Sequence, residues 1–145
     1  MRMLFALILT LAMVSSCAKE VPDKPVSVAD VVDNIHAWDG KIVTVVGWLG
    51  TCQGYDCGLY PTMRDAEIVA TISSDNGGWK IAMGRRVSIG FDEEFDRAAG
   101  PLQFSKVSIR GKVSDECRGL FVGCTDRASD LYPISITSYS SERAN

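Results

Sequence analysis

An uninterrupted apolar segment opens the chain and differs from everything that follows it. Residues 3–9 are all apolar, the apolar character resumes through Val14, and Arg2 is the only charged residue before Cys17. A positive residue followed by about ten apolar ones is typical of a secretory signal peptide, whereas a membrane-spanning helix needs about 18 or more. No later run approaches that length. We therefore expect the chain to be exported.

A helical period of apolar positions comes next. Residues 27–38 are predicted to form one amphipathic helix, in which the apolar side chains that share a face are Val28, Val31, Val32 and Ile35. Their spacing of three and four residues matches the helical period. Ser27 can cap the amino end, with Asp30 three positions on, and Asp39-Gly40 ends the segment with a turn.

The remaining pattern predicts a mainly β fold. From Cys17 onward Val and Ile total 22 and Leu only 5, and branched side chains favour strands because they pack well on a pleated sheet. We expect five to six short strands, formed within the segments 41–49, 58–63, 67–73, 79–83, 86–91, 104–113 and 132–139. Pro61 should make the second of these segments an edge or irregular strand. Short strands with one helix indicate a small closed or half-open barrel, with a β-sandwich as the alternative.

Two stretches of this region resemble small bacterial OB-fold-like domains. In those domains a short helix leads through Asp-Gly-Lys into a first strand of the form x-Val-x-Val-x-Gly, and residues 27–47 are similar to that opening. Residues 107–113, Val-Ser-Ile-Arg-Gly-Lys-Val, look like a companion barrel strand. The resemblance implies an OB-like β-barrel domain over residues 27–145, made of five to six strands with one short N-terminal helix.

The sequence Val-Ser-Ser-Cys that ends at Cys17 resembles the lipobox of bacterial lipoproteins. By this resemblance residues 1–16 are a signal peptide, and Cys17 carries the lipid anchor through its thiol. Ala18 follows, where Asp would be the usual inner-membrane retention signal, so the resemblance implies attachment at the periplasmic face of the outer membrane. Residues 17–26 contain two prolines and four charges and are expected to form a flexible tether.

Four cysteines remain after Cys17, and their even number in an exported protein favours disulfides. Their spacing predicts two local bridges, Cys52–Cys57 and Cys117–Cys124, each of which closes a short glycine-containing loop and contributes about 2 kcal/mol. Bridges that cross between the two loops are the alternative. A structural zinc site or a redox pair fits less well, because zinc thiolates must stay reduced and no Cys-x-x-Cys is present.

Charge and motif content argue against several function classes. Beyond the leader, 14 basic and 18 acidic side chains give a net charge of −4, which argues against nucleic acid as a partner. His36 is the only histidine and is expected to stabilise a helix end. The acidic run 92–96 is expected to be a solvated loop rather than a calcium site. Lys80, Arg85 and Arg86 are expected to lie at a strand edge and to keep it soluble. Because no known catalytic motif occurs, we expect no catalytic site, metal or cofactor.

Aromatic residues are the strongest candidates for a binding surface. Trp48, Tyr55, Tyr60 and Trp79 lie in the β region, and such rings can stack on sugars or hold a peptide, although they also fill cores. We select Tyr55, Tyr60 and Trp79, because glycines and the Cys52–Cys57 loop coincide with this zone. The chain is therefore expected to be a non-catalytic binding or assembly module, anchored at the outer membrane, with an envelope protein or glycan as partner. A small envelope hydrolase that uses a carboxylate pair is the alternative.

Overall fold

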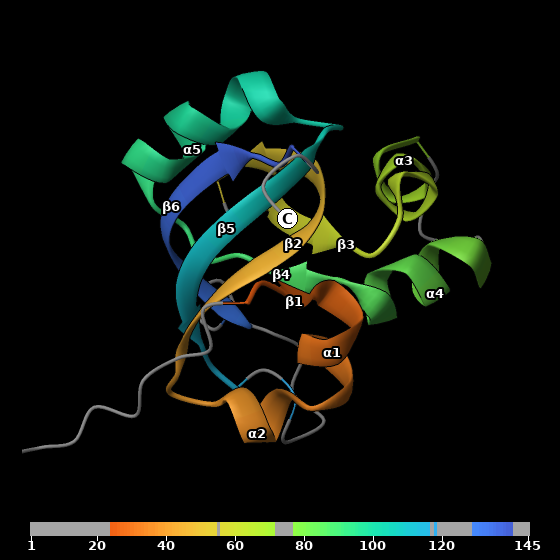
Figure 1. Ribbon diagram of the computed structural model, residues 1–145. Helices are drawn as coiled ribbons and strands as arrows, with labels where there is room; N and C mark the ends of the chain where they lie inside the picture. The colour runs from red at the N-terminus through yellow and green to blue at the C-terminus, as the bar shows by residue number, and fades with distance from the viewer. Residues whose placement is uncertain (1–23, 55, 72–76, 117, 119–128, 141–145) are drawn as a thin grey trace, which may run out of the picture.

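Figure 1 shows the computed structural model, which describes residues 24–54, 56–71, 77–116, 118 and 129–140. A curved sheet forms its centre, with short helices around it. The strands are β1 (Val26–Ser27), β2 (Ile42–Gln53), β3 (Asp56–Tyr60), β4 (Val87–Ser88), β5 (Lys106–Val113) and β6 (Leu131–Ser138). The helices are α1 (Val28–Asp33), α2 (Ile35–Trp38), α3 (Met63–Thr71), α4 (Gly77–Arg85), α5 (Glu93–Ala99) and the 3-10 turn η1 (Gly100–Leu102). The expectation of a mainly β fold is confirmed.

The six strands form one mainly antiparallel sheet with β2 in its middle. The order is β4-β3-β2-β5-β6, with antiparallel neighbours throughout, and β1 pairs with β2 in parallel. β5 runs along one edge of β2 from Ile42 to Trp48. The opposite edge is shared, since β1 covers it at Val45 and Val46 and β3 covers it from Trp48 onward. β2 therefore changes neighbours on one edge near Gly47.

The sheet is not closed into a barrel. Its edge strands β4 and β6 approach each other at an isolated parallel bridge between Ile89 and Leu131, and no continuous ladder joins them within the described ranges. The reason is that β4 has only two residues, which is too short to pair along β6. Between the edge strands β4 and β6, Asp130 accepts hydrogen bonds from Ser88 and Arg118. The expected barrel is thus found only in part, and an open sheet or a sandwich describes the architecture.

Alternate strand residues build the hydrophobic core on the inner face of the sheet. The fully buried side chains at these inward positions include Val43, Val45, Leu49, Leu59, Val107, Ile109, Val113 and Leu131. Helix α1 adds Val28 and Val31, and α5 adds Phe95. Because successive side chains of a strand point to opposite faces, the residues between these core positions form the outer face of the same sheet.

The predicted N-terminal helix is present but is divided into α1 and α2. Ser27 caps α1, since its Oγ accepts the backbone N–H of Asp30 at 3.1 Å and donates to the Asp30 carboxylate at 2.7 Å. Asn34, with φ of −127°, leaves the helical region and separates the two helices. As expected, His36 lies in the last turn of its helix, where it is 2.7 Å from the carboxylate of Asp115.

Two segments that were predicted as strands are helical instead. Described residues of 67–73 and 79–83 lie in α3 and α4, respectively. Thr62 explains the first error, because its Oγ1 accepts the N–H of Asp65 at 3.1 Å and donates to the Asp65 carboxylate at 2.7 Å. The first of these bonds satisfies a free backbone N–H at the helix start, and the pair outweighs the strand-like alternation that follows.

Two expectations about charged segments are also wrong. The acidic run 92–96 is not a loop, because Asp92 caps α5 by accepting the N–H of Phe95 at 2.7 Å. Acidic side chains in the first turn of a helix are stabilised by the partial positive charge there. Lys80 and Arg85 lie on α4 rather than on a strand edge.

The first predicted disulfide is confirmed. Cys52 on β2 and Cys57 on β3 face each other in the register of the hairpin and are bonded, with their Cα atoms 4.1 Å apart. This bond excludes the crossed pairings that were the alternative. Cys117 and Cys124, the second predicted pair, lie outside the described residues.

Candidate binding groove

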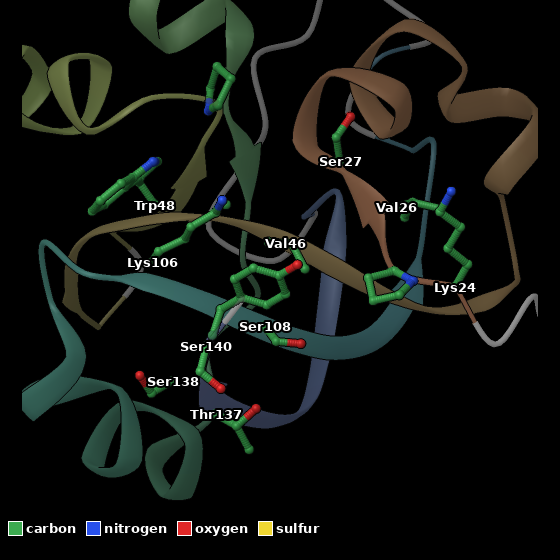
Figure 2. Close-up of a pocket in the computed structure, with 14 residues that line it drawn as sticks. Lys24, Val26, Ser27, Val46, Trp48, Lys106, Ser108, Thr137, Ser138 and Ser140 are labelled. Carbon is green, nitrogen blue, oxygen red and sulfur yellow. The ribbon is translucent and has the colours of Figure 1, made fainter. Parts of the chain in front are cut away.

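A groove with a volume of about 750 Å³ lies on the outer face of the sheet, where β1 meets β2. Figure 2 shows Trp48 and Lys106 at one end of it and Lys24 and Val26 at the other. The groove begins at the point where the strand paired with one edge of β2 changes from β1 to β3. Gly47 at this junction has no room for a side chain, because a Cβ would lie 2.8 Å from the carbonyl oxygen of Tyr60.

An aromatic residue, a lysine and a second aromatic residue lie side by side across one end of the groove. Trp48 on β2 is directly opposite Lys106 on β5. Tyr139, just after β6, donates its backbone N–H to the carbonyl of Lys106 at 3.0 Å. The Nζ of Lys106 lies 5.0 Å from the centre of the Tyr139 ring, which is a cation–π distance. The lysine is thus placed between two flat apolar surfaces that can take part in ligand contact.

Hydroxyl groups form the next row. In the register of the sheet, four residues on neighbouring strands form one row: Ser27, Val46, Ser108 and Thr137. All of them except Val46 carry a hydroxyl. The hydroxyl of Ser27 already serves the α1 cap. Those of Ser108 and Thr137, with Ser138 and Ser140 nearby in the lining, add hydrogen-bonding groups to the floor.

The charge of the groove is opposite to that of the chain. Among the described residues, Lys24 and Lys106 are the charged side chains in its lining; both are exposed, and no described carboxylate lines it. Within the described part of the chain neither lysine forms an ion pair. The whole chain has a net charge of −3, so two unneutralised cations in one cavity form a local positive site.

The structure describes two of the three selected aromatic residues, Tyr60 and Trp79, and places both differently from what the sequence predicted. Tyr60 is only 2% exposed and therefore belongs to the interior rather than to a binding surface. Its ring packs against Gly50 and Gly58, and its hydroxyl is hydrogen-bonded to Arg86. Burial raises the pKa of this hydroxyl above 10.0. Trp79 is half-buried on α4 and does not line the groove, and Tyr55 lies outside the described residues.

The other polar clusters among the described residues give no second candidate site. His36 and Asp115 form an exposed pair, and Arg86 pairs with the exposed carboxylate of Asp56 at 3.3 Å. Burial raises the pKa of Asp96, whose Oδ1 has no hydrogen-bond partner, while the N–H of Gly54 lowers it in part. No group of three or more His, Cys, Asp or Glu residues in the described ranges is placed to hold a metal ion.

Sequence reasoning considered Trp48 but missed Lys106, Tyr139 and the hydroxyl row. Lys106 and Ser108 stand at alternate positions of one segment that was correctly predicted as a strand, and Thr137 and Tyr139 do so in another. A polar outer face was therefore readable from each of these strands alone. What joins them is the register between β2, β5 and β6, which links residues far apart in the chain.

Comparison of the chain with protein-family models, curated proteins and solved structures finds no match. Of the helices that the structure describes, none has the length and apolar character needed to cross a bilayer. Cys17 and the segment before it lie outside the described residues. The functional argument therefore rests on the groove and on the leader sequence.

Proposed function

We propose that this protein is a lipoprotein of the bacterial outer membrane, anchored through Cys17, whose folded domain binds a component of the cell envelope without catalysis. The observation that carries the binding role is the groove of about 750 Å³ on the outer face of the sheet. Its volume lies within the range of ligand sites, about 300–1,000 Å³. The lipobox-like sequence before Cys17 supports the anchor and the location.

The lining supports binding rather than hydrolysis. Acid–base catalysis and glycoside cleavage use carboxylates or imidazoles close to the substrate, and the described side chains that line this groove include neither. Hydroxyls, two lysines and two aromatic rings are groups that hold a ligand by hydrogen bonds, charge and stacking.

The open sheet is proposed to be a partly open OB-like barrel. OB folds are five-stranded, partly open Greek-key barrels. The strand order, in which β2 lies between β3 and β5, and the parallel approach of Ile89 to Leu131 between the two edges support this assignment.

Photo-crosslinking in intact cells tests the binding role. A photoreactive residue is introduced into the full chain at Ser108, on the floor of the groove, and in a matched control at Lys112, on the same strand and face but outside the lining. We expect an envelope component to be captured from position 108 and not from position 112. Equal capture at both positions would contradict the proposal, as would hydrolysis of envelope material that depends on one carboxylate.

The anchor is tested separately. Cys17→Ser should leave an uncleaved precursor that incorporates no labelled fatty acid, whereas the unaltered chain should be processed and labelled. Normal processing of the variant would refute the lipoprotein assignment and leave the groove untouched.

A further inference from the structure

We propose that the groove binds the anionic headgroups of the phospholipids in the membrane that holds the anchor. This inference rests on the proposed function, since it names the envelope component that the groove contacts. Three independent features support it: the local charge, the aromatic rings that flank it, and the position of the groove relative to Cys17.

Charge complementarity favours an anion. Lys24 and Lys106 are exposed and share a cavity, and within the described part of the chain they have no ion-pair partner and no carboxylate beside them in the lining. Without the leader the chain has a net charge of −4, so it is repelled as a whole by an anionic surface. Such a surface therefore favours the orientation in which these two lysines face it.

The aromatic rings favour a membrane surface over a soluble anion. Trp48 and Tyr139 flank Lys106 on both sides, and both contribute to the lining. Trp and Tyr concentrate at the headgroup level of bilayers, because one part of each ring system is apolar and another can form hydrogen bonds. The hydroxyls of Ser108 and Thr137 add donors for phosphate oxygens.

The position of the groove brings it to the bilayer. Lys24, which lines the groove, follows Cys17 by seven residues. A chain of that length spans at most about 25 Å when fully extended. The tether therefore ends in the wall of the groove and keeps it close to the lipids that surround the anchor.

The anchor also makes a weak site sufficient. Each lysine near an anionic membrane contributes about fivefold to the association constant, which would not retain a soluble protein. A short flexible tether, however, gives an effective concentration in the millimolar range. Groove contact then determines how the domain is oriented on the membrane.

Paramagnetic quenching in lipid nanodiscs tests this inference on the lipidated mature protein. Discs of phosphatidylethanolamine and phosphatidylglycerol, doped with a headgroup spin label, are compared with discs of phosphatidylcholine carrying the same label. We expect amide signals of β5 and β6 beside the groove to be quenched in the anionic discs and much less in the neutral ones. Lys106→Gln should lower the ratio of engaged to free domain about fivefold, and Lys112→Gln should leave it unchanged.

Each other outcome identifies a different failure. Equal quenching in both kinds of disc, or no effect of Lys106→Gln, would overturn the headgroup proposal. Perturbation of the same signals by a soluble acidic glycan such as polygalacturonate, with no quenching by anionic discs, would also overturn it and assign the groove to glycans. A chain that does not stay in the discs at all would show instead that the lipid anchor is absent, which is a failure of the proposed function.

Discussion

The Asp130→Ala substitution should strongly destabilise the domain, because it removes the carboxylate that links the two edges of the open sheet. The carboxylate accepts hydrogen bonds from the backbone N–H and the hydroxyl of Ser88 at 2.9 and 3.0 Å. It also accepts from Nε and Nη2 of Arg118 at 3.1 and 3.0 Å. Asp130 is only 2% exposed, so water does not replace these contacts easily when the carboxylate is removed.

The size of the effect follows from what the substitution leaves behind. The Arg118 guanidinium, whose side chain is 24% exposed, would lose its carboxylate partner and keep only its hydrogen bond to the carbonyl of Arg86. The Ser88 N–H would lose its acceptor. Removing one member of a buried ion pair costs about 3–5 kcal/mol. Total stability of a domain this size is about 5–15 kcal/mol, and the loss should lower the Tm by roughly 10–20 °C.

Urea unfolding followed by circular dichroism measures the loss, with Asp56→Ala as the matched control. Asp56 also pairs with an arginine, at 3.3 Å, but its side chain is 68% exposed. Exposed pairs contribute about 0–1 kcal/mol, so the control should change little. If Asp130→Ala cost no more than Asp56→Ala, the argument that this polar contact replaces a strand ladder between β4 and β6 would be refuted.

Three further predictions concern packing, the disulfide and pH. Gly50→Ala should destabilise the domain by about 1–3 kcal/mol, because a Cβ there would lie 2.6 Å from the buried ring of Tyr60. In the control, Gly84→Ala, the added Cβ meets nothing within 4 Å, so urea unfolding should show no loss of stability or a gain. Replacing Cys52 and Cys57 with serine should cost about 2 kcal/mol, and thiol labelling of the denatured, unreduced native chain should find neither cysteine free. Burial raises the pKa of Asp96 above 3.8. The stability that the protonated Asp96 carboxyl contributes is therefore present below pH 3.8 and is lost as the pH rises through the pKa of the folded state. Asp96→Asn should therefore stabilise the domain at neutral pH, and thermal melting in acid should show that the gain disappears.

Strands with strong alternation were predictable from the sequence, and segments controlled by local capping were not. Apolar residues at every second position identify β2 and β5, since the core they build is the main source of their stability. Residues 67–73 alternate as well, yet Thr62 and Asp65 begin a helix there. Whether the sheet closes was beyond prediction, because it depends on how far β4 pairs, which no local pattern specifies.

The error at Tyr60 has a definite physical cause. Neighbouring glycines were taken as signs of an open binding zone. In the folded chain Gly50 and Gly58 instead leave the space that the Tyr60 ring fills, at distances that a side chain at either position would violate or crowd. Glycine beside an aromatic residue thus indicates close packing as readily as exposure, and only the register of β2 with β3 decides between them.

Stability and binding are separated on the same strands by the alternation of side chains. On β5 the inward residues Val107 and Ile109 are fully buried in the core, while Lys106 and Ser108, which alternate with them, face the groove. Surface substitutions away from caps and buried networks usually change stability by less than about 0.5 kcal/mol. Replacement of Lys106 should therefore leave folding intact, and a loss of membrane contact in that variant reports on the groove itself rather than on the fold.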